Sequence, residues 1–202
     1  VDSDYAKPFN PFIHYFTSLQ TWDGKTDHIG QLTKTVKATD QAFFEDSFRR
    51  WLVGMVACAI NDEVQNHQLM LLHGAQGKGK STFIRRLLPP ELKDYYRNGR
   101  IYPENKDHLL QMSSCLLINL DEFDKYAPTK MPLLKNLMQM ASLSLCKAYQ
   151  KNYRSLPRIA SFIGTSNRKD LLTDPTGSRR FICVLVEYPI DCEGIDYAQL
   201  YA

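Results

Sequence analysis

The pattern of apolar and polar positions along the chain predicts alternating helices and strands. From Asp40 to Asn61, apolar side chains recur every three or four residues behind an Asp suited to a helix N-terminus, which predicts a long amphipathic helix. Helical spacing returns briefly at Thr82 to Leu88, where Pro89-Pro90 would end it, and at Leu133 to Met140. Short, mainly apolar runs predict buried strands at 69–72, 116–120, 158–164 and 181–186.

This order of elements is typical of an α/β fold with a central parallel sheet. We expect a single domain over residues 1–202: a helical lead-in at 1–62, a nucleotide-binding core at 63–190, and the start of a truncated C-terminal segment at 191–202. The 40–61 helix is expected to pack on the edge of the sheet. The last residues, 197–202, resemble a helix start with no core left to cover.

Composition narrows the class of protein. The 202 residues are 44% hydrophobic and 23% charged, which is ordinary globular composition. The longest apolar stretch, Trp51 to Ile60, is about half of what a helix needs to cross a hydrocarbon layer of roughly 30 Å, so no membrane contact is expected. The five cysteines form no Cys-x-x-Cys pair, which indicates reduced packing thiols in a cytoplasm. A net charge of +3 identifies no polyanionic partner, so any nucleic-acid argument must rest on local clusters.

A glycine-rich loop lies between the predicted strand at 69–72 and the predicted helix at 82–88. It satisfies the phosphate-loop pattern in full, in the strand-loop-helix context that the mechanism requires. Glycines let backbone N–H groups turn toward phosphates, and the following helix adds its positive N-terminal end. We expect Lys80, in a solvated loop, to hold the β- and γ-phosphates and Ser81 to offer its hydroxyl to Mg²⁺. The residues expected to bind ATP here are Gly74, Ala75, Gln76, Gly77, Lys78, Gly79, Lys80, Ser81 and Thr82.

Two carboxylates, Asp121 and Glu122, follow the predicted strand at 116–120. We expect that strand to be the neighbour of the loop strand, so that its end lies beside the phosphate loop. Asp121 is then expected to complete the Mg²⁺ shell, through water, and Glu122 to polarise the attacking water.

Amide and guanidinium groups follow the next two predicted strands. Asn167 closes the third strand, where its amide could orient the water against the γ-phosphate; an Asn that caps a turn is the alternative. Arg179 and Arg180 come just before the fourth strand. Arginine is always charged and can fork onto phosphate, so one of the two is expected to act as an arginine finger on the ATP of a neighbouring subunit. An ordinary ion pair is the alternative.

This series of motifs resembles the ATPase part of the virulence-associated E proteins. The motifs that carry the resemblance are Gly74 to Ser81, Asp121-Glu122, Thr165-Ser166-Asn167 and Ser178 to Phe181, with further matches at Trp22 to Lys25, Arg50 to Gly54, and Tyr149 followed by Leu156 to Arg158. The family comprises phage and mobile-element primase-helicases related to the superfamily-three helicases of the AAA+ class. The resemblance implies a three-layer P-loop NTPase of AAA+ type, a ring of identical subunits, a primase domain or partner, and the cytoplasm of a bacterial host.

Basic and aromatic residues alternate ahead of the third strand, where superfamily-three helicases carry a hairpin that grips single-stranded DNA. Cations there would neutralise backbone phosphates, and tyrosines could stack on bases without reading sequence. The residues expected to contact DNA are Lys147, Tyr149, Lys151, Arg154 and Arg158. An ordinary solvated hairpin is the alternative.

Together these features predict an ATPase, with ATP and Mg²⁺ as cofactors, that couples hydrolysis to movement on single-stranded DNA as the helicase part of a replication protein. Two other classes stay open. A small-molecule P-loop kinase has less use for Glu122 and the arginine pair, and a non-enzymatic module would use ATP only to switch DNA binding. The five histidines show no metal-ligand spacing and are expected to be structural.

Overall fold

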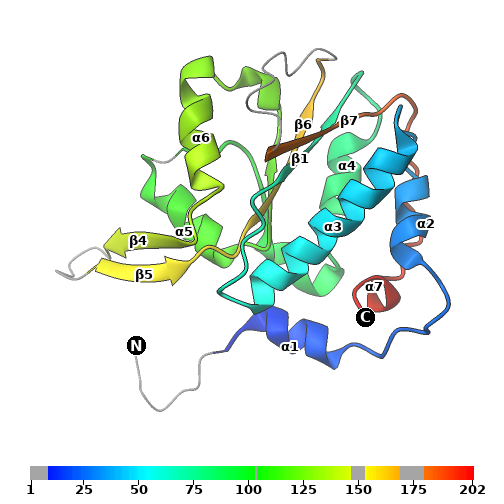
Figure 1. Cartoon of the computed structure of the whole chain (residues 1–202), viewed down its shortest axis with the longest axis horizontal. Helices are drawn as coiled ribbons and strands as arrows, with labels where there is room; N and C mark the ends of the chain where they lie inside the picture. The colour runs from blue at the N-terminus through cyan, green and yellow to red at the C-terminus, as the bar shows by residue number, and fades with distance from the viewer. Residues whose placement is uncertain (1–8, 103, 147–152, 169–179) are drawn as a thin grey trace.

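Parallel strands form the centre of the molecule. A computed structural model describes residues 9–102, 104–146, 153–168 and 180–202 (Figure 1). Within these ranges a five-stranded sheet has the order β2-β3-β6-β1-β7, and every neighbouring pair is parallel. The strands are β1 (Leu69–His73), β2 (Tyr96–Asn98), β3 (Leu117–Leu120), β6 (Ser161–Ser166) and β7 (Phe181–Leu185). The predicted α/β class with a central parallel sheet is confirmed.

Helices cover the sheet, and a separate hairpin extends from it. The α-helices are α1 (Pro11–Ser18), α2 (His28–Lys34), α3 (Gln41–Ile60), α4 (Lys80–Arg85), α5 (Lys106–Ser114), α6 (Met131–Leu137) and α7 (Tyr197–Leu200). Short 3₁₀ turns are η1 (Pro90–Tyr95), η2 (Phe123–Lys125) and η3 (Pro128–Lys130). An antiparallel hairpin pairs β4 (Ser142–Cys146) with β5 (Tyr153–Pro157) and lies beside α5 (Figure 1).

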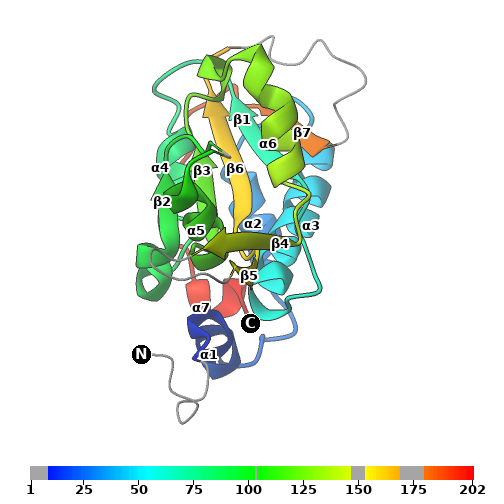
Figure 2. The same ribbon diagram turned by 90° about the vertical axis from the view of Figure 1, so that its left-hand side faces the viewer.

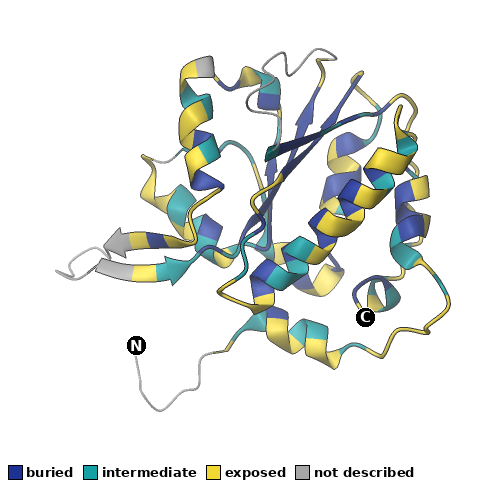
Figure 3. Ribbon diagram, in the orientation of Figure 1, coloured by how far each residue is buried: buried dark blue, intermediate teal, exposed yellow. Residues whose placement is uncertain are grey.

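Side chains alternate between two hydrophobic clusters, one on each face of the sheet. On β1, Met70 and Leu72 pack with α3 and α4, whereas Leu69 and Leu71 pack with α5 and α6. Figure 2 shows α5 and α6 in front of the sheet with α3 behind it, and Figure 3 shows the buried residues concentrated on the strands and on the inner faces of these helices. All five residues of β1 are buried, as expected of a central parallel strand.

The predicted long helix is confirmed as α3, but it does not lie on the edge of the sheet. The Asp40 side chain accepts the N–H of Phe43 at 3.0 Å and begins the helix. Phe44, Phe48 and Met55 are fully buried against the strands. The Trp51 indole N–H donates to the Phe162 carbonyl of β6 at 3.0 Å, and β6 is an interior strand. The apolar stripe of α3 therefore covers a face of the sheet, because that is where its area can be buried.

Sequence patterns missed strands that lack an apolar run. β2 is a polar edge strand, and it contributes Asn98, whose side-chain oxygen accepts from Asn119 of β3 at 2.7 Å. The third predicted strand begins later than expected, at Ser161. The N–H groups of Ile159 and Ala160 instead donate to the carbonyl of Met112 at the end of α5. A hydrophobic pattern alone cannot reveal this competition for backbone partners.

The C-terminal helix α7 does have a core to cover. Leu200 and Tyr201 are buried, and the Tyr201 hydroxyl donates to the Leu87 carbonyl at 2.6 Å. The Tyr197 hydroxyl donates to the Arg86 carbonyl at 2.7 Å. The expectation that these residues have nothing to pack against is therefore wrong, because two tyrosine hydroxyls satisfy the carbonyls that follow α4.

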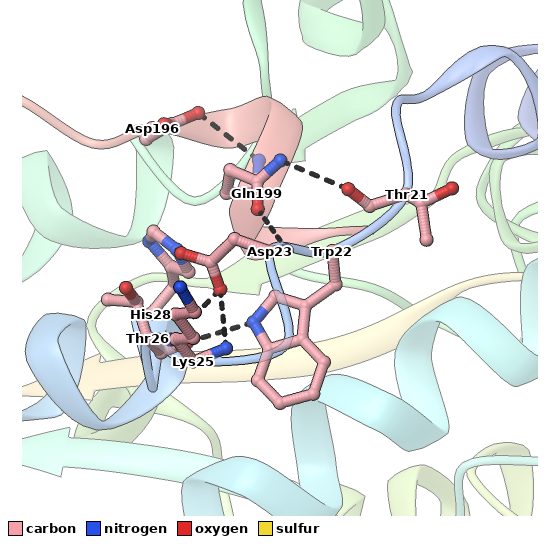
Figure 4. A network of polar contacts seen from close by, with 8 residues as sticks. All are labelled: Thr21, Trp22, Asp23, Lys25, Thr26, His28, Asp196 and Gln199. Atoms are coloured by element: carbon pink, nitrogen blue, oxygen red, sulfur yellow. Dashed lines mark hydrogen bonds and ion pairs between the residues drawn. The ribbon is translucent and has the colours of Figure 1, made fainter.

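One side chain of α7 also joins this helix to the segment between α1 and α2 (Figure 4). The Gln199 amide accepts the N–H of Asp23 at 2.9 Å and donates to the Thr21 carbonyl at 3.5 Å. The Asp23 carboxylate in turn accepts the N–H groups of Lys25 and Thr26, each at 2.9 Å, and closes the turn that presents Trp22. These hydrogen bonds hold the pKa of Asp23 well below its usual value, at about 2.

The low pKa of Asp23 predicts a pH dependence of stability. A carboxyl group whose pKa is depressed in the folded state stabilises the fold above its unfolded pKa of about 3.9, and that stabilisation is lost as the pH falls toward about 2. We expect Asp23→Asn to flatten the fall in the free energy of unfolding between these pH values, measured by urea denaturation. The exposed Asp62→Asn variant is the control, and an unchanged pH profile for Asp23→Asn would contradict the assignment.

Candidate nucleotide-binding site

The glycine-rich loop connects β1 to α4, as predicted. Gly74 has a φ of 135°, and a Cβ there would lie 2.5 Å from the Val186 carbonyl oxygen, so no other residue fits this position. Its N–H donates to the Ser166 carbonyl at 3.2 Å, which fixes the start of the loop to the tip of β6. Gly79, with a φ of 80°, then allows the chain to enter α4.

Lys80 lies inside the loop rather than in solvent. Only 6% of the residue is exposed, and its Nζ donates to the carbonyls of Gly74 and Ala75, both at 2.8 Å. A third contact, at 3.3 Å, reaches the side-chain oxygen of Asn167. Burial lowers the pKa of Lys80, and the nearby Asp121 carboxylate opposes that shift. The prediction of a solvated lysine is wrong because the loop carbonyls surround the ammonium group.

Two predicted magnesium ligands meet at the start of α4. The Ser81 hydroxyl lies 3.4 Å from an oxygen of Asp121. The same Asp121 oxygen accepts the hydroxyl of Thr165, which comes from the next strand. A hydroxyl and a carboxylate are the hard oxygen ligands that Mg²⁺ takes, so these residues could hold that ion.

Glu122 lies beside Asp121 in an uncommon backbone conformation. Its φ is 51°, and it alone among the described non-glycine residues has a positive φ. Its carboxylate is about half exposed and pairs with the Lys125 ammonium at 2.5 Å and with the Arg100 guanidinium at 3.9 Å. The pairing holds the carboxylate at the rim of the site.

The acidic strand is not the direct neighbour of the loop strand. β6 lies between β1 and β3, so the predicted adjacency is wrong. The tip of β6 instead carries Thr165, Ser166 and Asn167 into the gap between Lys80 and Asp121. The result is an open pocket of about 320 Å³. It is lined by Gln76, Gly77, Lys78, Gly79, Lys80, Ser81, Thr82, Asp121, Glu122, Thr165, Ser166 and Asn167.

The predicted arginine fingers do not line this pocket in the described part of the chain. Arg179 lies outside the described residues. Arg180 precedes β7 directly and is half-buried, and its Nε is buried without a hydrogen-bond partner among the described residues. In the ranges that the structure describes, Arg180 is not part of the lining of the pocket around the phosphate loop.

The structure contradicts the predicted contact between Arg158 and DNA. Lys147, Tyr149 and Lys151 lie outside the described residues, and Arg154 lies on β5 with a side chain that is likewise not described.

Arg158 itself is buried in the core, with 1% of the residue exposed. Its guanidinium donates to three carbonyls, of Met140 at 2.8 Å, Ala160 at 2.6 Å and Asn66 at 3.3 Å. It also lies over the Phe162 ring, 5.8 Å from the centroid. A basic residue so enclosed braces the base of the hairpin and cannot reach DNA.

The remaining expectations about metals and membranes have simpler outcomes. Among the described residues, no group of three or more His, Cys, Asp and Glu side chains could hold a metal ion. Burial lowers the pKa of His73, the last residue of β1. Cys58, Cys115, Cys183 and Cys192 are free. The described helices include none with the length and hydropathy of a membrane span.

Sequence reasoning assigned no role to three side chains that shape the site: Thr165, Asp124 and Arg100. Thr165 is 4% exposed and holds Asp121, and the Ser166 hydroxyl donates to Asp124 at 2.6 Å. The available signal was the run of three polar residues, 165 to 167, at the end of a buried strand. No sequence signal brings Arg100 to Glu122.

The fold and the site define an α/β domain in which the pocket lies at the carboxyl ends of parallel strands. The chain belongs to the virulence-associated protein E-like domain family, whose model matches residues 16–202. No curated protein matches the chain.

Solved structures of the NrS-1 C-terminal region are similar in fold. Two apo structures of its residues 305–718 each match 91% of this chain, with a TM-score of 0.56 and sequence identities of 14% and 15%. A further apo structure of the C-terminal region matches 98% of this chain, with a TM-score of 0.55 and 16% identity. The chain spans 41%, 42% and 49% of those three solved chains, which is less than half of each.

The burial of Arg158 predicts a loss of stability rather than a loss of DNA affinity. Arg158→Met keeps most of the side-chain length but removes the donor from three carbonyls, two of them in buried hydrogen bonds, so the free energy of unfolding should fall by about 2–4 kcal/mol. Arg50→Met is the control, because the exposed Arg50–Asp46 pair should contribute no more than about 1 kcal/mol. Equal stabilities of the two variants in urea denaturation would contradict this role.

Proposed function

We propose that this chain is a P-loop ATPase domain of AAA+ type that hydrolyses ATP with Mg²⁺ and acts on single-stranded DNA. One observation carries the proposal: a complete phosphate loop brings Lys80 and Ser81 within reach of a carboxylate from another strand, around an open pocket. The resemblance of the motif series to primase-helicases supports a role in replication, with a ring of identical subunits and a primase domain or partner.

The loop residues would bind the phosphates. Backbone N–H groups of the loop after Gly74 would face the phosphates, and the Lys80 ammonium already lies against the loop, in contact with the carbonyls of Gly74 and Ala75. On ATP binding, the Lys80 ammonium would exchange its loop carbonyls for β- and γ-phosphate oxygens, which carry more negative charge. Burial of this lysine strengthens that attraction, because fewer waters screen it.

The Ser81 hydroxyl and the Asp121 carboxylate would hold Mg²⁺, which neutralises charge on the β- and γ-phosphates when bound. Thr165 would orient the carboxylate by its hydrogen bond. Glu122 would accept the proton of the attacking water, once its carboxylate exchanges Lys125 for that water. Asn167, already in contact with Lys80, would orient the water against the γ-phosphate.

The remaining residues are proposed for steps between molecules. Arg179 or Arg180 would act on the ATP of a neighbouring subunit. Lys147, Tyr149, Lys151 and Arg154 would bind the single strand through phosphates and stacked bases. Phosphate release measured with and without single-stranded DNA, beside a screen of small acceptor molecules, separates this motor from a kinase and from an ATP-operated switch.

Two substitutions should stop the reaction at different steps. Glu122→Gln removes the proton acceptor but keeps the shape of the side chain, so ATP binding should persist while phosphate release falls about a hundredfold or more. Lys80→Ala should abolish tight ATP binding, measured by calorimetry. Lys93→Ala, an exposed lysine outside the pocket, is the matched control.

Because Lys80 is buried, each variant also needs a thermal unfolding curve to show that the fold is intact. Parent-rate hydrolysis by Glu122→Gln would remove Glu122 from the mechanism. Unchanged nucleotide affinity in folded Lys80→Ala would overturn the ATPase assignment.

The basic residues proposed to bind DNA predict how a substitution there changes the salt dependence of DNA binding. Replacing Lys147, Lys151 and Arg154 with Ala removes three charges, so the slope of log affinity against log salt should shrink by roughly 2 units. Basal ATP hydrolysis without DNA should stay at the parent level, since none of the three belongs to the phosphate loop. An unchanged slope and affinity in fluorescence anisotropy titrations would show that DNA is bound elsewhere or not at all.

A further inference from the structure

The tip of β6 contacts three separate parts of the proposed ATPase site through three consecutive side chains. Thr165 donates to Asp121, Ser166 donates to Asp124 at 2.6 Å, and Asn167 accepts from Lys80 at 3.3 Å. All three side chains line the pocket, but their partners differ: Thr165 and Asn167 contact Asp121 and Lys80, whereas Ser166 contacts Asp124 of η2. Ser166 is therefore the member of the three whose hydroxyl bonds the chain beyond Asp121 rather than Asp121 or Lys80.

Ser166 is built to hold that chain in one place. The residue is 1% exposed, and its hydroxyl uses both of its capacities: it donates to Asp124 and accepts the N–H of Arg168 at 3.1 Å. A hydrogen bond from a buried hydroxyl to a carboxylate is among the stronger kinds in proteins. The position of Asp124 is thus tied to an interior strand of the sheet.

Asp124 belongs to the short turn η2, which begins immediately after Glu122. Glu122 has a φ of 51°, a conformation that is unfavourable in a residue with a side chain and persists only when its surroundings hold it. The Lys125 N–H donates to the Glu122 carbonyl at 2.9 Å, and Phe123 is buried against Phe181. Phe123 fixes the apolar side of the turn, and the bond between Ser166 and Asp124 fixes its polar side.

We propose that Ser166 and Asp124 form a positioning pair for Glu122: their hydrogen bond holds the strained turn against the tip of β6 and so keeps the Glu122 carboxylate at the mouth of the pocket. The inference rests on the proposed ATPase function, because Glu122 has a position to keep only if it activates water. Among the described residues, the Ser166 hydroxyl bonds Asp124 and the Arg168 N–H, and not Lys80, Ser81 or Asp121, which are proposed to hold the phosphates and Mg²⁺. The role of the pair is to position Glu122.

The test separates turnover from binding. Ser166→Ala should lower the single-turnover rate of phosphate release by about ten- to a hundredfold, the cost of displacing a catalytic group by a fraction of an ångström to one ångström. The dissociation constants for ATP and for Mg²⁺ should not change, because Lys80, Ser81 and Asp121 keep their own contacts. Ser113→Ala is the matched control: its hydroxyl bonds a carbonyl within α5, away from the pocket, and its removal should leave the rate unchanged.

Further variants distinguish positioning from a general effect on the fold. Asp124→Ala should match Ser166→Ala, the double variant should be no slower than either, and Asp124→Asn should keep most of the activity because its amide oxygen still accepts from Ser166. In a Glu122→Gln background, Ser166→Ala should cause no further loss. If Ser166→Ala does not fold, the same comparisons are made with Asp124→Ala.

Two results would overturn the positioning role while leaving the ATPase in place: parent-rate hydrolysis in the pair variants, or a further loss in the Glu122→Gln background. A parent protein that binds ATP but never releases phosphate would overturn the ATPase proposal itself, and this inference with it.

Discussion

The register of β6 between β1 and β3 is the constraint on which the candidate site depends. In that ladder His73 pairs with Ser166, and Leu120 pairs with Gly164. This register brings Asp121, which follows Leu120, beside Thr165. It also brings Gly74, which follows His73, beside the Ser166 carbonyl. A slip of one residue would turn every side chain of β6 to the other face and separate Thr165 from Asp121.

Close packing of β6 makes that register hard to change. A Cβ on Gly164 would lie 3.1 Å from both the Leu120 carbonyl oxygen and the Leu71 side chain, so a larger residue would push the strands apart. On the α3 face the Trp51 indole bonds the Phe162 carbonyl, and at the start of the strand Arg158 gathers three carbonyls. Buried polar groups of this kind must be paired to be tolerated, and here their partners all belong to the segments that border β6.

Whether an element depends on local or on distant contacts explains which sequence-based predictions succeeded. The phosphate loop and α3 depend on local spacing, so their elements could be predicted from residues near one another in the chain. The insertion of β6 between β1 and β3, the burial of Arg158 and the packing of Tyr201 depend on partners far away in the sequence. Arg158 lies near other basic residues in the sequence, which suggested that its side chain is exposed to solvent. In the structure its guanidinium donates to the carbonyls of Met140, Ala160 and Asn66, a role that requires several N–H groups on one side chain.

The same reasoning accounts for the unusual conformation of Glu122. Glu122 lies two residues beyond the end of β3, where the chain turns from the buried strand into η2. The chain makes that turn with a positive φ at Glu122 and stabilises it with Phe123 below and Asp124 beside it. A glycine at this position would relieve the backbone but would remove the carboxylate. Strain at a residue that carries a carboxylate, where glycine would fit the backbone better, supports the catalytic role proposed for Glu122.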